Sequence, residues 1–324
     1  MRAISPRKWG APEVLAPVEV ERPEPALTEI LVRVHAAGVN PVDWKIRGSG
    51  AFGETGPTPI LGYDVSGTVE AVGPGVTLFR PGDEVFGMPR FPELAGGYAE
   101  FVVAPARRFV RKPAGISHVQ AAALPLAALT AWQALVDTAR LSAGQRVLVH
   151  AAAGGVGHLA VQIAKAHGAY VIGTATTAKH SFLRGLGADE VIDYTAVDFT
   201  TAVRDVDVVL DAIGGDYAAR SLEVLRPGGH LVTLPSPDDL PPAERAVELG
   251  VHTGWTVVEP DHAALKAITA LVEEGKLHAA IDTVLPLEQA AKAHAYGEQG
   301  RTQGKIVLTV DQPATPETPA DRDR

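Results

Sequence analysis

Apolar and polar residues alternate over short stretches in the first third of the chain, and clusters of proline and glycine separate these stretches. Alternation with a period of two is typical of strands that bury one face. Strands of this kind are expected over residues 1–6, 29–36, 64–72, 84–88 and 98–103. Many short strands joined by turns predict a partly open antiparallel β-barrel over residues 1–119.

Beyond residue 120 the pattern changes to short, continuous apolar runs that alternate with segments of helical periodicity. A run without alternation is expected of a parallel strand that is buried on both faces. The runs lie at 147–149, at 171–172, at the end of 182–194, at 206–211 and at 230–234. Strands and helices in this order predict an α/β fold with a doubly wound parallel sheet over residues 120–258. Ligands are then expected beyond the carboxyl ends of its strands.

The remaining segments extend these two units or follow them. Residues 250–258 are predicted to form the last strand, at the edge of the parallel sheet. An exposed apolar edge is usually covered by a partner, so we expect a homodimer joined through this strand. Helices are expected over 261–274 and 287–297, followed by a closing strand over 305–310. Residues 311–324 are polar and rich in proline, and they are predicted to form a disordered tail.

A glycine-rich turn joins the first apolar run of the second unit to a helix. Ala152, Gly154 and Gly157 occupy the three positions of the G-x-G-x-x-G pattern, and Gly155 and Val156 complete the turn. Glycine at position 154 would let the backbone approach a pyrophosphate, and glycine at 157 would let the helix pack against the strand. Tight turns need glycine even where nothing binds. The complete strand–helix–strand setting nevertheless favours a dinucleotide at the amino end of the helix.

The residues after the second run favour NADP(H) over NAD(H). An NAD enzyme is expected to carry Asp or Glu here, to bind the 2′-hydroxyl of the ribose. This chain instead has Thr176, Thr177 and Lys179, whose hydroxyl and ammonium groups suit a 2′-phosphate. The alternative is that Thr176 caps the next helix and that Lys179 is a solvated surface charge.

The residues around the glycine turn also form a larger signature. Its members are Gly144, Gln145, Leu148, Ala152, Ala153, Gly154, Gly155, Gly157, Gln162 and Lys165. In these residues the sequence resembles the zinc-independent quinone oxidoreductases, the zeta-crystallin-like branch of the medium-chain dehydrogenases/reductases. The resemblance extends to about residue 310. It implies a GroES-like catalytic domain, completed by about 259–310, and a Rossmann domain that binds NADP.

The same resemblance assigns roles to individual cofactor residues. It implies that Lys179 and Tyr194 contact the 2′-phosphate and that the hydroxyl of Thr130 lies near the nicotinamide. A hydrogen bond from Thr130 to a helix carbonyl is the structural alternative.

Strand ends add further candidates to this set. Ile213 follows the fourth strand, where a ribose would pass, and Leu234 ends the fifth strand. Arg301 and Lys305 could reach phosphates or carbonyls of the cofactor or substrate, although cations near the carboxyl end need no such role.

The segment 38–50 is the first candidate for chemistry outside the cofactor site. Zinc-bearing relatives place a cysteine ligand where this chain has Asn40, and a histidine where it has Tyr63. An amide and a phenol are poor zinc ligands, so no metal site is predicted. We consider Asn40 and Lys45 as hydrogen-bond donors to a developing oxyanion, and Tyr63 as a proton source. The alternatives are a turn residue at Asn40, a solvated charge at Lys45 and packing at Tyr63. Asp43 is expected to cap a short helix.

Composition excludes several classes of function. The 324-residue chain carries a net charge of −9, which disfavours nucleic acid or an anionic membrane as its main partner. It has no cysteine, and therefore no disulfide and no thiolate for catalysis or metal binding. No apolar run approaches the roughly 18 residues of a membrane span, and the start is polar, so a cytoplasmic protein is expected.

The chemistry expected without a metal is hydride transfer from NADPH to a small-molecule acceptor that takes hydride readily. A quinone or an α,β-unsaturated carbonyl qualifies, because hydrogen-bond donors can hold the charge that develops on its oxygen. Two alternatives stay open. An enoyl-thioester reductase would need a basic groove, for which the candidates are Arg90, Arg107, Arg108 and Arg111. A non-enzymatic NADPH-binding protein of the zeta-crystallin type is the other.

Overall fold

The first sheet corresponds to the predicted barrel-like unit. The computed structural model describes residues 1–51 and 58–310. The strands of this sheet are β3 (Glu29–Val39), β4 (Asp64–Val72), β5 (Glu84–Gly87), β6 (Phe101–Pro105), β7 (Phe109–Arg111), β14 (Ile281–Pro286) and β15 (Lys305–Thr309). They follow the order β14-β15-β3-β4-β5-β7, and β6 also pairs with β3. A separate two-stranded sheet joins β1 (Arg2–Pro6) to β2 (Leu15–Glu19).

The closing strand returns to this first sheet, as the resemblance implied. β15 runs antiparallel to β3, and Ile306 lies opposite Val39. The pairing brings the end of the described chain next to the candidate segment that begins at Asn40. β14, which pairs parallel with β15, was not predicted. The strand expected over 98–103 begins only at Phe101. The tail predicted over 311–324 lies outside the described residues.

The second sheet is parallel throughout and has the order β10-β9-β8-β11-β12-β13. Its strands are β8 (Arg146–Val149), β9 (Tyr170–Thr174), β10 (Glu190–Ile192), β11 (Val206–Asp211), β12 (Leu225–Thr233) and β13 (His252–Trp255). Val147, Leu148 and Val149 are fully buried, which explains why this run shows no alternation. The strand order reverses between β8 and β11, where doubly wound sheets bind their ligands. The predicted α/β fold, a GroES-like unit with a parallel doubly wound sheet, is confirmed.

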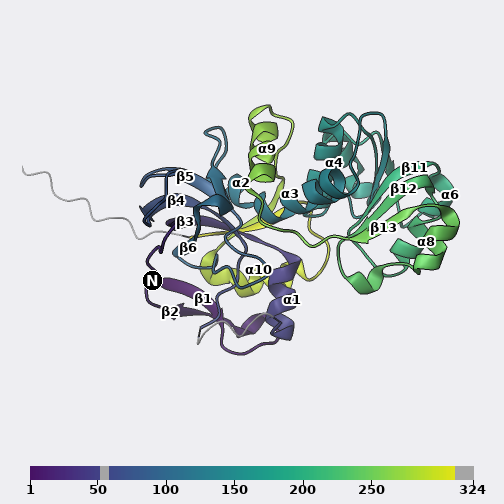
Figure 1. Ribbon diagram of the computed structural model, residues 1–324. Coiled ribbons are helices and arrows are strands. Elements are labelled where there is room, and N and C mark those ends of the chain that lie inside the picture. Colours follow the sequence, from purple (N-terminus) through teal and green to yellow (C-terminus); the bar gives the residue numbers. More distant parts are fainter. Residues whose placement is uncertain (52–57, 311–324) are drawn as a thin grey trace, which may run out of the picture.

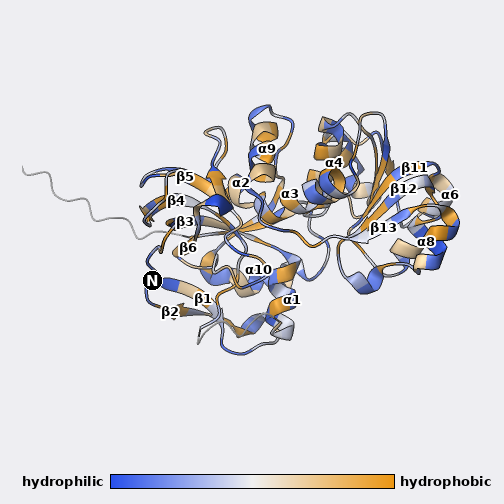
Figure 2. Ribbon diagram, in the orientation of Figure 1, coloured by the Kyte–Doolittle hydropathy of each residue, from blue (hydrophilic) through white to orange (hydrophobic). Residues whose placement is uncertain are grey.

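Helices fill the connections between these strands. The α-helices are α1 (Pro41–Ser49), α2 (His118–Ala122), α3 (Pro125–Trp132), α4 (Gly157–Ala166), α5 (His180–Gly185), α6 (Phe199–Ala202), α7 (Asp216–Ser221), α8 (Ala243–Leu249), α9 (His262–Glu273) and α10 (Ala290–Gly297). The 3₁₀ turns are η1 (Pro12–Val14), η2 (Ala106–Arg108), η4 (Thr177–Lys179), η5 (Pro237–Asp239) and η6 (Leu287–Gln289). Figure 1 shows the first sheet on the left and the parallel sheet on the right, and Figure 2 shows the apolar strands inside both.

The apolar segment after residue 120 forms three consecutive helical pieces rather than one helix. α2 ends at Ala122, α3 starts at Pro125, and a π-helical turn, η3 (Gln133–Thr138), follows. Pro125 has no N–H to continue the preceding helix, so the chain restarts there with proline in the first helical turn. In Figure 1, α2 and α3 lie between the two sheets.

β13 forms one edge of the parallel sheet, as predicted for the segment 250–258. Trp255, the last residue of β13, is 41% exposed. An open strand edge with an exposed aromatic residue is compatible with pairing to a second copy. The homodimer stays a prediction.

Candidate active site

The glycine-rich turn between β8 and α4 is closely packed. A Cβ atom on Gly157 would lie 2.4 Å from the carbonyl oxygen of Ala151, and one on Gly154 would lie 3.2 Å from the same oxygen. Only glycine therefore allows the start of α4 to approach the end of β8 so closely. Ala152, in the first position of the pattern, is fully buried. This arrangement fits a pyrophosphate, because the amino end of α4 offers N–H groups and a positive dipole end to an anion.

Hydrogen bonds hold the turn against the returning end of the chain. His158 donates from Nδ1 to the carbonyl oxygen of Gly154 (2.8 Å), and its Nε2 accepts from the N–H of Ala280 (3.2 Å). Burial lowers the pKa of His158 to about 4, so the ring is neutral and can play both roles. The N–H of Gly304 donates to the carbonyl oxygen of Ala153 at 2.9 Å. The turn is thus fixed from both sides before any ligand arrives.

Several predicted 2′-phosphate residues lie together at the end of β9. Lys179 donates to the carbonyl oxygens of Arg301 (2.9 Å) and Thr302 (3.0 Å). β9 ends at Thr174, and the Ala175-Thr176-Thr177 segment that follows carries no carboxylate. Burial lowers the pKa of the Lys179 ammonium. Its charge and the absence of an acid in this segment fit the extra phosphate of NADP.

A carboxylate not considered in the sequence analysis organises the next turn. Both the N–H and the hydroxyl of Thr177 donate to Asp193, and Thr195 donates to its other oxygen. These hydrogen bonds, that of the Thr177 hydroxyl first, hold the pKa of Asp193 well below its usual range. The hydroxyl of Thr177 is therefore committed to Asp193. Tyr194 follows directly and is 46% exposed, so its ring remains accessible to a ligand.

Asp211 shapes the two loops predicted to pass the rest of the cofactor. Its carboxylate accepts from the N–H groups of Ile213 (2.9 Å) and Gly214 (3.1 Å), and its carbonyl oxygen accepts from the N–H of Leu234 (2.9 Å). The loops after β11 and β12 are thereby tied to each other at the carboxyl end of the sheet. The hydroxyl of Thr130 donates to the carbonyl oxygen of Leu126 at 2.7 Å, which is the structural alternative foreseen for this residue.

Asn40 lies at the centre of a buried polar cluster where β3 meets α1. Its side chain donates from Nδ2 to Asp64 (2.8 Å), and its Oδ1 accepts from the ammonium of Lys305. Asp64 also accepts from the N–H of Leu126 at 2.7 Å, at the start of α3. Asn40 and Asp64 are 1% and 0% exposed, respectively. The cluster therefore joins three elements that are far apart in the sequence.

Asn40, and not Asp43, is the N-cap of α1. Asp43 occupies the third helical position and accepts from the N–H of Asn40 (2.8 Å), which completes a capping box. Its other oxygen accepts from the N–H of Gly62 (3.0 Å). Burial raises the pKa of Asp43 to about 7, and the nearby charge of Asp64 acts in the same direction. The expectation that Asp43 itself caps the helix was wrong, because Pro41 starts the helix three residues earlier than expected.

A row of buried groups leads from Asp43 to α10. Arg47 donates to Nδ1 of His294 at 3.3 Å, so the proton of this ring lies on Nε2, which faces the hydroxyl of Tyr98 at 3.1 Å. Burial raises the pKa of Tyr98 well above its usual range, and the charge and hydrogen bond of Asp43 add to this effect. The donors in this row thus point toward Asp43. Because Asp43 accepts from the N–H of Asn40, the row helps to fix the position of Asn40.

Lys45 and Tyr63 occupy very different positions. Lys45 is exposed on α1 and reaches the carbonyl oxygen of Pro235, in the loop after β12, at 3.3 Å. It therefore stands beside Leu234, one of the predicted cofactor residues. Tyr63 is fully buried, and its hydroxyl donates to the carbonyl oxygen of Pro92 at 3.1 Å. This arrangement favours the packing role considered for Tyr63 over that of a proton source.

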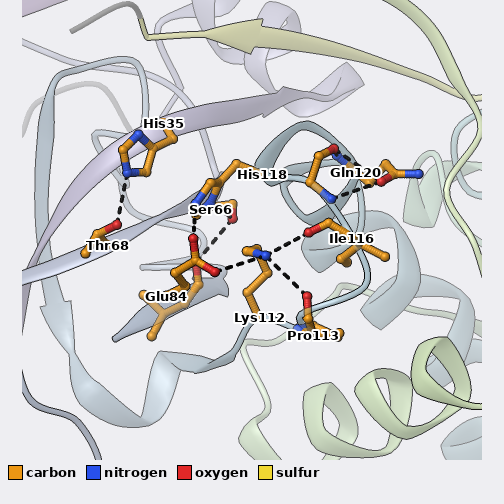
Figure 3. Close-up of polar contacts among 11 residues, drawn as sticks. His35, Ser66, Thr68, Glu84, Lys112, Pro113, Ile116, His118 and Gln120 are labelled. Carbon is orange, nitrogen blue, oxygen red and sulfur yellow. Dashed lines mark hydrogen bonds and ion pairs between the residues drawn. The ribbon is translucent and has the colours of Figure 1, made fainter. Parts of the chain in front are cut away.

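Figure 3 shows another polar cluster in the first sheet, in which Ser66, His118 and Glu84 form a hydrogen-bonded row. The distances are 2.8 Å from Ser66 Oγ to His118 Nδ1 and 3.1 Å from His118 Nε2 to Glu84. The row has the order of a Ser-His-acid triad, but Ser66 is fully buried and also donates to the carbonyl oxygen of Val85. A nucleophile must give its proton to the base, whereas the single hydroxyl hydrogen of Ser66 goes to Val85, so this row does not support hydrolytic chemistry.

Two negative findings apply to residues 1–51 and 58–310. Within this part of the chain, no three or more His, Asp or Glu side chains are grouped so that they could hold a metal ion. No helix in the same part is long and apolar enough to cross a membrane.

Sequence reasoning gave no role in the site to Asp64 or Asp211, and it considered Lys305 only as a cation that could reach the cofactor or substrate and not as a buried charge. Asp64 begins β4, Asp211 ends β11 and Lys305 begins β15, and each is at most 3% exposed. Charged residues are rarely so fully buried unless they are paired. For Asp211 and Lys305, the signal that could have found them was a charge at the end of an apolar run.

Comparisons with known proteins agree with this geometry. The family model described as alcohol dehydrogenase GroES-like domain matches residues 26–114, and the one described as zinc-binding dehydrogenase matches residues 186–308. Quinone oxidoreductase of Mus musculus is 35% identical, over 96% of this chain and 98% of that protein. The structure of Escherichia coli quinone oxidoreductase complexed with NADPH superposes with a TM-score of 0.86 at 30% identity, over 95% of this chain and 100% of that one.

A part of a much larger enzyme matches as well. Polyketide synthase GfsB of Streptomyces halstedii is 40% identical over 89% of this chain, which corresponds to 5% of that protein. The nearly full-length matches to quinone oxidoreductases, together with the glycine turn, decide the family. The chain belongs to the zinc-independent quinone oxidoreductase branch of the medium-chain dehydrogenases/reductases and is an NAD(P)H-dependent oxidoreductase.

Proposed function

We propose that this protein uses NADPH to reduce a quinone or an α,β-unsaturated carbonyl compound. The observation that carries the cofactor choice is the segment after β9, which offers Lys179 and no carboxylate. The exposed ring of Tyr194 stands next to it in the structure, beyond Asp193. The Escherichia coli relative, whose structure was solved as a complex with NADPH, supports the same choice.

Bound NADPH would supply the hydride, and the protein's own residues would bind and orient the reactants. The glycine turn at 152–157 would hold the pyrophosphate, and the loops around Ile213 and Leu234 would border the rest of the cofactor. Asn40 donates one Nδ2 hydrogen to Asp64, and its second Nδ2 hydrogen would donate to an oxygen of the acceptor. Lys45 would add a positive charge near the same place. Because the hydroxyl of Tyr63 already donates to the carbonyl oxygen of Pro92, we assign the proton to solvent.

The polyketide synthase match favours a second candidate, an enoyl-thioester reductase. The basic groove that this function needs is not supported by the arginines considered for it. Arg90 pairs with Glu29 at 3.3 Å, Arg111 pairs with Asp83 at 2.7 Å, and Arg108 donates to the carbonyl oxygen of Pro260. The charges of Arg90 and Arg111 are thus paired with carboxylates of the chain, Arg108 is held by a carbonyl oxygen, and Arg107 is exposed. We therefore place the thioester second.

Steady-state oxidation of NADPH and NADH with a panel of quinones, enones and enoyl thioesters tests the proposal. We expect turnover with quinones or enones and a preference for NADPH of at least about tenfold. Turnover with enoyl thioesters alone would support the second candidate. Binding of NADPH without turnover on any acceptor would indicate a non-enzymatic NADPH-binding protein. Location in the cytoplasm stays a prediction, which fractionation of the source cells would test.

A further inference from the structure

Lys305 is a buried cation whose ammonium group is surrounded by three oxygen acceptors. Its Nζ donates to the carbonyl oxygen of Val39 (3.0 Å) and to Oδ1 of Asn40, and it lies 3.4 Å from Oδ2 of Asp64. An ammonium group has three hydrogens, so all of them have partners inside the protein. The side chain is 3% exposed. Lys305 is therefore a fixed charge of the interior and not a donor that waits for a ligand.

The stem of the same side chain lies against the glycine-rich turn. Its Cδ atom is 3.4 Å from the position that a Cβ atom on Gly155 would take. The preceding residue, Gly304, donates its N–H to the carbonyl oxygen of Ala153 at 2.9 Å. Lys305 thus lies beside the turn that fits the pyrophosphate and donates to the amide that is proposed to bind the acceptor. A single side chain therefore connects the glycine-rich turn to Asn40.

The charges around Asn40 fix the orientation of its amide. With Oδ1 toward Lys305, the Nδ2 group faces Asp64, and both contacts are attractive. Exchanging the two ends would place an NH₂ group against an ammonium and a carbonyl oxygen against a carboxylate. Both contacts would then be repulsive in a site from which water is excluded. Only one orientation is stable, and it presents the second Nδ2 hydrogen in a defined direction.

We propose that Lys305 is a positioning residue. It fixes the amide of Asn40 as a hydrogen-bond donor and holds this amide at a fixed position relative to the glycine-rich turn. The proposal rests on the proposed function, because it assigns the Asn40 donor to the acceptor's oxygen. It does not require that Lys305 touch the substrate. It requires that the positive charge at this one place matter more than the volume of the side chain.

Lys305→Met tests the charge, because methionine keeps most of the stem and removes the ammonium. The stem contact with Gly155 persists in this variant, so the dissociation constant of NADPH, measured by fluorescence, should change less than about threefold. Turnover should fall about tenfold to a hundredfold, the range for loss of one preorganised donor. Wild-type turnover in Lys305→Met would overturn the proposal.

Lys112 offers a matched control in the same sheet. Its ammonium lies 3.2 Å from Glu84 and donates to the carbonyl oxygens of Pro113 (3.2 Å) and Ile116 (2.7 Å), as Figure 3 shows. The side chain is 5% exposed. Lys112 follows β7, at the opposite end of the sheet from β14 and β15. Lys112→Met removes an equally buried lysine and should leave turnover unchanged. An equal loss of turnover in both variants would overturn the positioning role.

Chemical rescue separates charge from structure. Lys305→Ala leaves space for propylammonium, which replaces the three missing carbons and the ammonium, and 1-propanol is the neutral control. We expect propylammonium to restore part of the lost turnover, and 1-propanol to restore none. Equal effects of the two compounds would overturn the proposal. The wild type and Lys112→Ala should not respond to either compound.

The effect of propylammonium can also be measured on protein stability, without cofactor or substrate. Propylammonium should raise the free energy of unfolding of cofactor-free Lys305→Ala and leave that of the wild type unchanged. If Lys305→Ala does not fold alone, refolding with propylammonium present should recover it, whereas refolding with 1-propanol should not. The proposal would be overturned if propylammonium neither raised the free energy of unfolding nor improved the recovery on refolding. Absence of turnover in the wild type would refute the proposed function instead, and the unfolding measurement would still decide the role of Lys305.

Discussion

Lys305 donates a hydrogen bond to the side chain of Asn40, although 265 residues separate the two in the sequence. The contact exists because β15 pairs with the end of β3, which places Ile306 opposite Val39. The donor proposed for catalysis is therefore oriented by a residue from the last described strand. The candidate active site forms only after the chain has passed through the whole parallel sheet and returned.

Lys179 should decide the preference for NADPH. Its ammonium is held beside Arg301 and Thr302 by two carbonyl oxygens, in a segment without a carboxylate. We expect NADPH to bind at least about tenfold more tightly than NADH, which corresponds to ~1.4 kcal/mol. Lys179→Ala should weaken NADPH and leave NADH nearly unchanged, as measured by fluorescence titration. Lys276, an exposed lysine after α9, provides the control variant Lys276→Ala. Equal affinities of the wild type for both cofactors would contradict the assignment.

Lys45 should polarise the oxygen of the acceptor. It stands on α1 and reaches the loop after β12, so it spans the two units beside Leu234. Lys45→Met removes the charge and should lower turnover roughly tenfold to a hundredfold with little change in NADPH affinity. The exposed Lys266 on α9 gives a matched control, Lys266→Met, which should keep full turnover. Unchanged turnover of Lys45→Met on every accepted substrate would show that Lys45 is only a solvated surface charge.

Removal of metal ions should not affect the enzyme. The position of the zinc-bearing relatives' first ligand is held by Asn40, whose amide is already bonded to Asp64 and Lys305. An ammonium group at this place would also repel a divalent cation. Dialysis against a strong chelator should leave activity intact, and elemental analysis should find no stoichiometric zinc. Activity lost on dialysis and restored by zinc would show that this site has been misinterpreted.

Acid should destabilise the protein through its buried histidines. Burial lowers the pKa of His158 to about 4 and that of His150 to about 3. A lowered pKa in the folded state gives stability that is present above pH 6.5 and is lost as the pH falls toward 4. Each such histidine contributes a slope of up to about 1.4 kcal/mol per pH unit in this window. Asp43, with its pKa raised to about 7, acts in the opposite direction, because the stability it contributes is lost as the pH rises through 7.

Urea unfolding between pH 7 and pH 5 can isolate the contribution of His158. Glutamine can donate to Gly154 and accept from Ala280, and it does not titrate. The free energy of unfolding of His158→Gln should therefore fall less steeply with acidification than that of the wild type. The difference in slope should approach that of one bound proton, about 1.4 kcal/mol per pH unit. Parallel pH profiles of the two proteins would contradict the buried, neutral state of His158.

The sequence predicted those features that depend on neighbours in the chain. Uninterrupted apolar runs identified the parallel strands, and the spacing of Ala152, Gly154 and Gly157 identified the turn. The residues after the second run, which led to the prediction of NADP(H), lie in the same unit. In each case the signal and its structural cause lie within one strand–helix–strand unit.

The contacts that the sequence did not predict act across long separations. The partners of Lys305 come from β3, the N-cap of α1 and β4, and Asp193, which follows the neighbouring strand β10, accepts from Thr177. Tyr63 was considered a proton source because of its place in the sequence, whereas its hydroxyl bonds Pro92 inside the first unit. No local pattern reports which distant group a buried side chain will meet. These pairs follow from topology, which fixes strand order and register.

Hydride transfer from NADPH to a quinone or an α,β-unsaturated carbonyl compound can be tested by following deuterium from labelled NADPH into the product. NADPH deuterated at C4 of the nicotinamide, in each of its two epimers, is supplied with an enone, and the product is analysed by mass spectrometry. We expect one deuterium at the β-carbon of the reduced product with one epimer and none with the other. Product without deuterium from both epimers, or no reduction of any enone or quinone by protein that binds NADPH, would contradict hydride transfer from NADPH.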